Sequence, residues 1–277
     1  MRIDGGGIAQ AIREDLETQI AELAKKKIVP KIAIITLGPE ASWETYVRQK
    51  IKVASELGIK AILINLENAN DENLIQTVRQ IDSDFNYHGI IIQRPIPSNF
   101  NREQVVNSIS PEKDIDGFRI DSDFEVPAWL AVKHLVTESL KELKIKKSWK
   151  KLNFAVIGKG ETAGEPIIRG LKKLGVEPEI IDSKTLNRDE ILKNADVVIS
   201  TVGRKIVKPN QLKKGTILIG VGIHSEGGKA RGDYDENEIE PVAAAYTPTP
   251  GGVGPLNLAY LYKNLIQAAK TQDMVDK

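Results

Sequence analysis

No cysteine occurs in this chain of 277 residues, and aromatic residues make up only 5% of it. The absence of thiols excludes disulfide bonds, thiolate zinc sites and a cysteine nucleophile. No apolar run approaches the roughly 18 residues that a membrane-spanning helix needs, so no such helix is expected. The first residues, MRIDGGGIAQAIREDL, mix glycine with charge and lack the apolar segment of a signal peptide.

An excess of either charge is also missing. The 39 basic and 38 acidic residues leave a formal net charge of +1, which predicts neither a nucleic-acid nor a membrane partner. Apolar residues form 41% and charged residues 28% of the chain, as in an ordinary globular protein long enough for two modest domains. The absence of cysteine favours a reducing compartment, so we expect a cytoplasmic protein.

Two successive alternations of strand-like and helix-like segments are present. In the first, apolar runs predict strands over 31–38, 60–66 and 88–97, and helical spacing predicts helices over 7–27, 42–58 and 70–84. In the second, after the basic stretch 146–151, strands are expected over 152–158, 177–182, 196–201, 215–222 and early in 243–255, with helices over 165–175 and 189–195. Longer helices are expected over 126–144 and 256–272. The pattern predicts an α/β fold with parallel strands and helices on both faces.

The stretch AVIGKGETAGEP, residues 155–166, has the outline of a phosphate-binding loop. An apolar strand leads into Gly158, Gly160 and Gly164 and then into a helix, so backbone N–H groups and the helix dipole can meet a pyrophosphate. Its Gly-x-Gly-x-x-x-Gly spacing departs from the common fingerprint, and its two glutamates repel phosphate. A plain strand-to-helix turn therefore stays open as the alternative.

Asp182 ends the next predicted strand, 22 positions after Gly160. An acid at this place binds the ribose 2′-hydroxyl of adenosine in dinucleotide-binding folds. Lys159, Ser183 and Lys184 indicate the opposite choice, because cations and a hydroxyl suit a 2′-phosphate. A solvated aspartate at a strand end is the alternative for Asp182.

Polar residues before the glycine loop suggest a second site. Tyr46 and Lys50 are four positions apart and share one helix face, where burial of the lysine would tune its pKa for proton transfer. Gln93 ends an apolar strand, the position at which parallel sheets bind ligands. Asp114 and Asp116 share a short loop, in which a carboxylate can hold an amidine-like edge or simply cap a turn. A surface pair on an amphipathic helix is the alternative for Tyr46 and Lys50.

These motifs, in this order, resemble the bifunctional methylenetetrahydrofolate dehydrogenase/cyclohydrolase family. The resemblance spans nearly the whole chain and is carried by YVRQK (46–50), QRPIP (93–97), PEKDIDGF (111–118) and PTPGGVGP (248–255). It implies two α/β domains with a folate cleft between them. A folate-binding catalytic domain would comprise residues 1–127 plus the C-terminal helix 256–277, and a Rossmann-like NAD(P)-binding domain residues 146–250, with 128–145 as a connecting helix.

The resemblance also implies roles for individual residues. Lys50 is similar to the family's catalytic lysine and Gln93 to the glutamine that tunes it. Tyr46 would stack on the aminobenzoate part of folate, and Asp116 would hold the pterin. Substrate would also contact the turn at Pro250, Gly251 and Gly252. The cofactor-binding residues would be Gly158, Lys159, Gly160, Gly164, Asp182, Ser183, Lys184 and Ile223.

The implied activity is oxidation of 5,10-methylenetetrahydrofolate to the methenyl form and hydrolysis of that form to 10-formyltetrahydrofolate, in one-carbon metabolism and purine biosynthesis. NADP is the family's usual cofactor, with NAD as the alternative. A homodimer through the Rossmann-like domain is implied, and no metal is expected because the three histidines have no ligand spacing.

Several residues depart from the family pattern. Lys159 stands in the place of an arginine, Arg94 of a leucine, Gly220 of an aspartate and Asn257 of a threonine, while Ala128–Leu130 replace a Cys-Thr-Pro segment. These departures leave three alternatives: cyclohydrolase activity alone, a folate-binding protein with an impaired cofactor site, and an unrelated two-domain α/β dehydrogenase.

Overall fold

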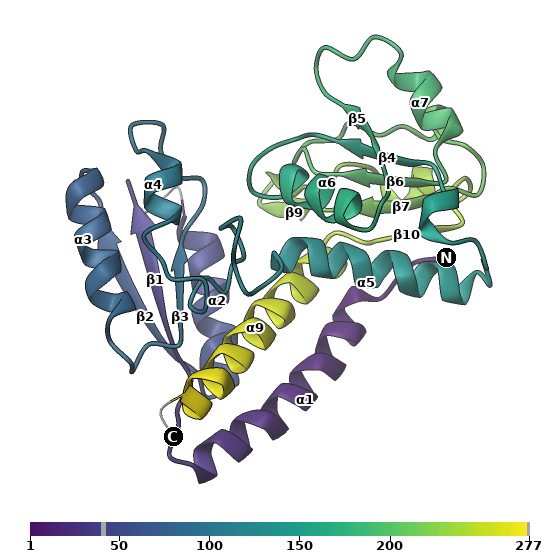
Figure 1. The fold of residues 1–277 in the computed structure, drawn as a ribbon. Helices are drawn as coiled ribbons and strands as arrows, with labels where there is room; N and C mark the ends of the chain where they lie inside the picture. Colours follow the sequence, from purple (N-terminus) through teal and green to yellow (C-terminus); the bar gives the residue numbers. More distant parts are fainter. Residues whose placement is uncertain (40–42, 276–277) are drawn as a thin grey trace. The chain divides into compact units, whose positions relative to one another are not determined.

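The computed structural model describes residues 1–39 and 43–275. Contacts along the chain divide it into two compact units. The five-stranded unit comprises residues 1–9 and 128–257, and the three-stranded unit comprises residues 10–127 and 258–277. Figure 1 gives the elements of each.

The three-stranded unit is built on a small parallel sheet with strand order β2-β1-β3. β1 (Lys31–Leu37), β2 (Lys60–Leu66) and β3 (Gly89–Ile92) alternate with α2 (Glu44–Glu56) and α3 (Asp71–Asp82), and a short α4 (Arg102–Val106) follows. β1 and β3 are almost wholly buried because helices and loops cover both sheet faces. α3 begins where the Asn70 side chain accepts a hydrogen bond from the Asn73 N–H, at 2.9 Å.

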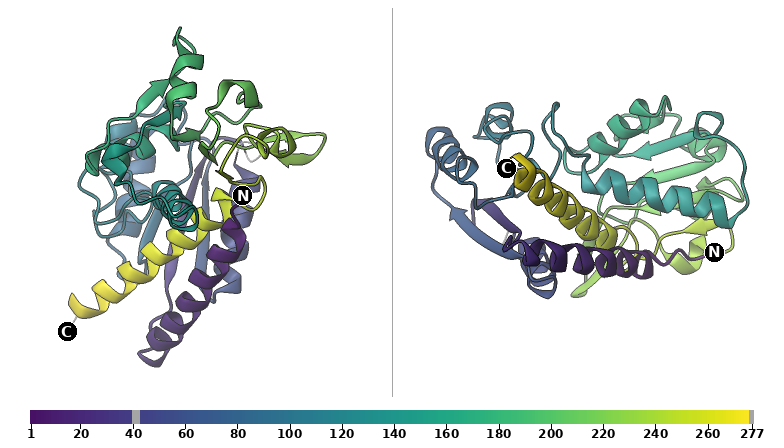
Figure 2. Two further views of the ribbon diagram at one scale, coloured as in Figure 1. Left: turned by 90° about the vertical axis from the view of Figure 1, so that its right-hand side faces the viewer. Right: turned by 60° about the horizontal axis from the view of Figure 1, so that its bottom comes forward.

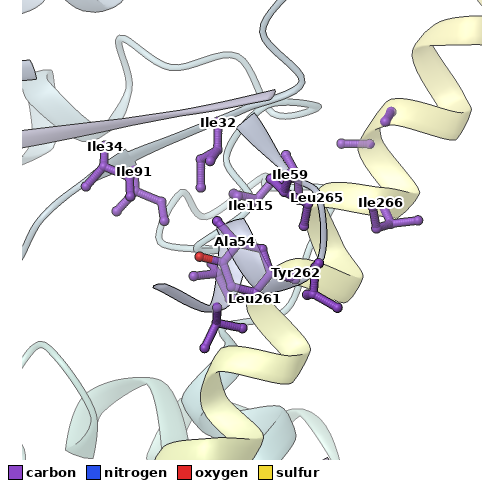
Figure 3. Packing of buried hydrophobic residues seen from close by; sticks show 14 of the residues in the cluster. Ile32, Ile34, Ala54, Ile59, Ile91, Ile115, Leu261, Tyr262, Leu265 and Ile266 are labelled. Atoms are coloured by element: carbon purple, nitrogen blue, oxygen red, sulfur yellow. The ribbon is translucent and has the colours of Figure 1, made fainter. Parts of the chain in front are cut away.

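Two long helices, α1 (Gly5–Lys25) and α9 (Val253–Val275), complete this unit. They lie side by side (Figures 1 and 2), and Lys26 forms an ion pair with Asp273 at 2.7 Å. The apolar face of α9 packs into the core of the sheet. Figure 3 shows Tyr262 and Leu265 of α9 among the buried side chains, with Ile115 and the strand residue Ile91. A helix from the C-terminus therefore completes the N-terminal sheet.

The five-stranded unit contains an all-parallel sheet with strand order β10-β7-β6-β4-β5. Its strands are β4 (Phe154–Ile157), β5 (Glu179–Ile181), β6 (Val197–Ser200), β7 (Ile217–Gly220) and β10 (Ala245–Tyr246). Its helices are α5 (Pro127–Glu142), α6 (Gly164–Lys173), α7 (Arg188–Asn194) and α8 (Glu236–Ile239). The chain leaves β4 toward β5 on one side and later pairs β6 on the other, so the carboxyl ends of β4 and β6 form a topological switch point.

The predicted strand and helix alternation is confirmed, with differences at its ends. The strand expected over 88–97 ends at Ile92, and α9 begins at Val253, before the predicted residue 256. The expected first residue of α2, Ser42, lies outside the described residues. Sequence periodicity missed α4, α8 and the hairpin of β8 (His224–Glu226) and β9 (Lys229–Arg231). These elements have only three to five residues, too few to show a period.

The division into units differs from the predicted domain boundaries at residues 1–9, 128–145 and 256–257, all of which belong to the five-stranded unit. Residues 128–145, the expected connecting helix, belong to the five-stranded unit. The Trp129 ring of α5 meets Trp149 edge-on at 6.3 Å, and a β-carbon at Gly170 of α6 would overlap the Trp129 indole. Residues 1–9 also belong to this unit, where the Ile3 N–H donates to the Tyr246 carbonyl at 2.9 Å.

Candidate active site

Lys50 and Tyr46 lie one turn apart on α2, as their spacing predicts, but their surroundings differ. Lys50 lies on the buried face of the helix, with Val47, Val53 and Ala54, and only 9% of it is exposed. Tyr46 is 52% exposed. The helix thus buries the ammonium group and leaves the aromatic ring open to solvent.

Gln93 fixes the position of the Lys50 side chain. The Lys50 Nζ donates to the Gln93 Oε1 at 2.9 Å, and the Gln93 Nε2 donates to the Arg94 carbonyl at 2.8 Å. Both ends of the amide are therefore occupied, which sets its oxygen toward the lysine. Gln93 directly follows β3, and its N–H donates to the Ile35 carbonyl of β1 at 2.8 Å. The amide is thus anchored at the carboxyl edge of the sheet, where ligand sites of parallel sheets lie.

The electrostatic surroundings lower the pKa of Lys50. Burial is the largest cause, because it penalises the charged form. The negative charge of Asp116 raises the pKa of Lys50 and the positive charge of Arg94 lowers it further. A lysine of this kind can exchange a proton nearer to neutral pH than an exposed one.

The loop that contains Asp114 and Asp116 gives the two carboxylates different surroundings. Asp114 is buried, its Oδ2 accepts a hydrogen bond from the Arg119 N–H at 2.8 Å, and its burial raises its pKa to about 6. Gly117 has a φ of +70°, and a β-carbon there would lie 2.7 Å from the Phe124 carbonyl oxygen. Asp114 therefore shapes the loop, while the half-buried Asp116 remains accessible to a ligand.

Two residues of α9 brace this site and were missed in the sequence. The Tyr262 hydroxyl donates to the Lys50 carbonyl at 2.6 Å. The Asn264 side chain donates to the carbonyls of Ile115 at 2.9 Å and Glu125 at 3.1 Å. Both side chains are buried. In the sequence they are polar positions in an amphipathic helix, and no local signal pairs them with segments more than a hundred residues away.

The glycine loop of the five-stranded unit follows β4 at the switch point. Gly158 has a φ of +92°, and a β-carbon there would lie 2.7 Å from the Thr201 Oγ1. A β-carbon at Gly164 would overlap the Gly158 carbonyl, whereas one at Gly160 would meet no atom within 4 Å. Gly158 and Gly164 thus allow close packing of the loop, and the space at Gly160 leaves its backbone open. With α6 beginning at Gly164, the loop fits a dinucleotide phosphate.

Asp182 and Lys159, the two candidate ribose contacts, form an ion pair with each other at 2.8 Å. The Asp182 Oδ1 also accepts from the Lys184 N–H at 2.9 Å. The hydrogen bond from Lys159, followed by that from the Lys184 backbone, lowers the pKa of Asp182 to about 2. Ser183 and Lys184 are exposed. Carboxylate and cation therefore stand together beside the glycine loop.

Tyr234 explains the glycine at position 220. A β-carbon at Gly220 would lie 2.9 Å from the Tyr234 ring, and the Tyr234 hydroxyl donates to the Thr247 carbonyl at 2.6 Å. The neighbouring Asp233 accepts hydrogen bonds from the Ser200 hydroxyl at 2.6 Å and from the N–H groups of residues 202–204. Tyr234 thus fills the space beside β7, and Asp233 holds the loop after β6. Neither residue was predicted from the sequence as part of a site.

The remaining predicted contacts lie in two turns of the five-stranded unit. Ile223 is exposed, and a β-carbon at Gly203 would lie 3.0 Å from its carbonyl oxygen. Pro250 is exposed, Gly251 has a φ of +105°, and a β-carbon at Gly252 would lie 2.6 Å from the Pro248 carbonyl oxygen. Glycine is therefore required at both positions of that turn.

Within residues 1–39 and 43–275, no three His, Asp or Glu side chains gather as a metal site, and no helix has the length and apolar character to span a bilayer.

These features define a class of protein: a two-unit α/β enzyme with a nucleotide-type glycine loop in one unit and a buried, amide-held lysine in the other. The chain belongs to the tetrahydrofolate dehydrogenase/cyclohydrolase family. The profile of the family's catalytic domain matches residues 3–116, and that of its NAD(P)-binding domain matches residues 132–273.

Individual relatives agree with this assignment. The bifunctional protein FolD of Staphylococcus aureus (strain JH9) is 31% identical over 286 residues, covering 99% of this chain and 98% of that protein. The FolD methylenetetrahydrofolate dehydrogenase/cyclohydrolase of Campylobacter jejuni is 29% identical, with a TM-score of 0.88 over 98% of this chain and 99% of that chain. The Trypanosoma brucei FolD, solved with NADP and an inhibitor, is 27% identical, with a TM-score of 0.85 over 98% of this chain and 97% of that chain. The family expected from the motifs and the α/β architecture with a Rossmann-like sheet are confirmed.

Proposed function

We propose that this protein oxidises 5,10-methylenetetrahydrofolate to 5,10-methenyltetrahydrofolate with NADP⁺ and hydrolyses the methenyl form to 10-formyltetrahydrofolate. The observation that carries the proposal is the buried Lys50, held by the Gln93 amide and depressed in pKa. The bifunctional relatives that match nearly the full chain support the same pair of reactions.

In the hydrolysis, Lys50 is the proton carrier. Its neutral amine takes a proton from the water that attacks the methenyl carbon and returns this proton to the ring nitrogen as the bond between that nitrogen and the carbon breaks. The remaining hydroxyl proton leaves to solvent as the formyl carbonyl forms. The depressed pKa supports this role, because it increases the neutral fraction at a given pH. Gln93 keeps the amine oriented through the 2.9 Å hydrogen bond.

Two further residues bind the folate in this proposal. Asp116 holds the pterin, since a carboxylate accepts two hydrogen bonds from an amidine-like edge. Tyr46 offers its exposed ring to the aminobenzoate, and stacking of aromatic rings contributes roughly 1 kcal/mol beyond the area that it buries. The turn at Pro250, Gly251 and Gly252 supplies backbone without β-carbons as a further contact surface.

NADP, when bound, accepts the hydride that leaves the one-carbon unit. The chain's own residues would hold it: Gly158, Gly160 and Gly164 would admit the pyrophosphate, and Lys159, Ser183 and Lys184 would bind a 2′-phosphate. Asp182 would lie next to the ribose, and Ile223, whose apolar side chain is exposed, would contact the cofactor. The structure of the Trypanosoma brucei relative with NADP supports the choice of cofactor.

Asp182 favours a second candidate function, hydrolysis without an efficient oxidation. Its carboxylate occupies the Lys159 amine at 2.8 Å and carries a negative charge where the 2′-phosphate would approach. Oxidation would then be slow with NADP, while hydrolysis, whose proton carrier Lys50 lies in the other unit, would be unaffected. NAD has no 2′-phosphate for the Asp182 carboxylate to repel, so this arrangement weakens NAD binding less than NADP binding.

The experiment that tests these proposals measures both reactions on the purified protein. Methenyltetrahydrofolate formation is followed with NADP⁺ and with NAD⁺, and hydrolysis is followed from added methenyl substrate. Turnover of both kinds supports the bifunctional proposal, and hydrolysis alone supports the second candidate. If neither reaction is detected but calorimetry still shows folate binding, the protein has a binding function only.

We also propose a cytoplasmic homodimer formed through the five-stranded unit. The edge strand β5 supports this proposal, because among the described strands it pairs with β4 alone and its Ile180 is exposed. A sizing run with light scattering tests it, and a monomeric mass at micromolar concentration contradicts it.

A further inference from the structure

The Arg94 guanidinium lies over an aromatic ring of the loop that follows Asp116. Its central carbon is 3.6 Å from the centroid of the Phe118 ring, a cation–π distance. Arg94 is the residue after Gln93, and Phe118 lies two residues after Asp116. The contact therefore joins the strand end that contains Gln93 to the loop that contains Asp116.

The backbone of Arg94 takes part in the same arrangement. Its carbonyl accepts the 2.8 Å hydrogen bond from the Gln93 Nε2, while the Gln93 Oε1 accepts from the Lys50 Nζ at 2.9 Å. Contacts thus run without a gap from Lys50 through Gln93 and Arg94 to Phe118. A shift of the Arg94 backbone would turn the amide away from the lysine.

The charges that act on Lys50 come from the same two segments. Asp116, on the loop, favours the ammonium form, and Arg94, at the strand end, disfavours it. From α9, Tyr262 contacts the Lys50 carbonyl through its neutral hydroxyl, and Arg13 of α1 acts on that tyrosine. Burial of Lys50 and the charge of Arg94 thus lower its pKa together, while Asp116 acts against them.

We propose that Arg94 is a positioning residue: held on the Phe118 ring, it ties the strand end of Gln93 to the loop of Asp116 and places a fixed positive charge beside Lys50. Only its consequence for hydrolysis rests on the proposed function. The geometry itself can be tested on the protein without substrate.

The first test measures the ionisation of Lys50 directly. Competitive acetylation of lysine amines, read by mass spectrometry over a pH series, gives the midpoint at which Lys50 becomes reactive. Arg94→Gln removes the positive charge, so this midpoint should rise by at least about 0.3 pH unit. At a pH well below the midpoint, a rise of this size halves the fraction of Lys50 that is neutral. Arg94→Lys is the matched control that keeps a charge, and its midpoint should stay near the wild-type value. An unchanged midpoint in Arg94→Gln, or an equal rise in Arg94→Lys, overturns the proposal.

The second test addresses the contact with the ring. Phe118→Leu keeps the charge of Arg94 and removes only the aromatic ring that it contacts. Hydrogen exchange at the Arg119 amide, which donates to Asp114, should become faster in Phe118→Leu and in Arg94→Gln. Exchange at the wild-type rate in both variants would show that Arg94 does not hold the loop.

The third test connects the arrangement to hydrolysis. In Arg94→Gln the pH–rate profile of kcat should move to higher pH in parallel with the acetylation midpoint. A rise in KM with an unmoved profile would mean that Arg94 binds substrate directly, which overturns the positioning role. If the wild-type protein shows no hydrolysis at all, the proposed function is contradicted, but the acetylation result still tests the role of Arg94.

Discussion

The Nζ of Lys50 lies 2.9 Å from the Oε1 of Gln93, although the two residues are 43 positions apart. One residue comes from a buried helix face and the other from the end of a buried strand, so neither position can move without disturbing the core. A hydrogen bond between two buried side chains restricts both the orientation of the amine and its protonation. A substitution at either residue should therefore change the orientation and the protonation of the Lys50 amine.

Lys50→Met should reduce methenyltetrahydrofolate hydrolysis by at least about 100-fold, the contribution of a positioned proton carrier. Methionine retains most of the buried length of the lysine without its charge, so the fold should persist. Hydrolysis rates and circular dichroism of the purified variant measure the two effects. The control is Lys52→Met on the exposed side of the same helix, where Lys52 only approaches Glu56 at 3.8 Å. Near-wild-type hydrolysis in Lys50→Met would remove the lysine from the mechanism.

The motifs of the sequence predicted Lys50, Gln93 and Asp116 as one site, and the structure brings these residues into one unit. Their interaction became visible only in three dimensions, because a hydrogen bond across 43 residues leaves no local pattern. Tyr262 was missed for the same reason: it is one polar position in an amphipathic helix, and its partner lies 212 residues away.

The fold was more predictable than its boundaries. Fully buried strands such as β4 and β6 are uninterrupted apolar runs, which sequence periodicity detects well. The boundary at residues 128–145 was not predictable in this way, because it depends on Trp129 meeting Trp149 and Gly170. Packing between helices distant in the chain leaves no periodic signal, and it decides to which unit a helix belongs.

Asp114 should make the folding stability depend on pH. Its pKa is raised from 3.8 to about 6 by burial, so the native state binds a proton that the unfolded chain releases between these values. This contribution to stability is fully present below pH 3.8 and is lost as the pH rises through about 6. At 1.36 kcal/mol for each unit, the loss amounts to roughly 3 kcal/mol. Asp114→Asn cannot titrate, so the free energy of unfolding of wild type should fall relative to this variant between about pH 4 and pH 7.

Urea unfolding of both proteins over this range measures the difference. Asp123→Asn, at an exposed carboxylate of the same loop, is the control, and its curve should run parallel to that of wild type. A constant difference between Asp114→Asn and wild type at all pH values would mean that Asp114 is not protonated in the native state near pH 5.

Asp182→Asn should strengthen the binding of a 2′-phosphate. The pKa of Asp182 is about 2, so its carboxylate is charged throughout the neutral range and competes for Lys159. Calorimetry with 2′,5′-ADP should show about three- to tenfold tighter binding in the variant, with a smaller gain at high salt. Binding of 5′-AMP, which lacks that phosphate, should change little. Lys159→Ala should have the opposite effect on 2′,5′-ADP.

Glu179→Gln is the control for this series, because it removes an exposed negative charge from β5, the strand just before Asp182, and leaves the ion pair between Asp182 and Lys159 in place. Equal gains in Asp182→Asn and Glu179→Gln would assign the effect to overall charge rather than to the ion pair. Unchanged affinity for 2′,5′-ADP in both Asp182→Asn and Lys159→Ala would mean that the 2′-phosphate binds elsewhere.

Gly170 and Trp129 should behave as a coupled pair in stability. A β-carbon at Gly170 would overlap the Trp129 indole, which packs α5 on α6, so Gly170→Ala should destabilise the protein by about 1–3 kcal/mol through overpacking. In a Trp129→Leu background the indole is gone, and the same alanine should cost less than about 0.5 kcal/mol. Gly254→Ala, at a helical glycine with no atom within 4 Å of the added carbon, should be tolerated. Urea unfolding of the four proteins of the cycle measures the coupling, and equal costs of Gly170→Ala in both backgrounds would contradict it.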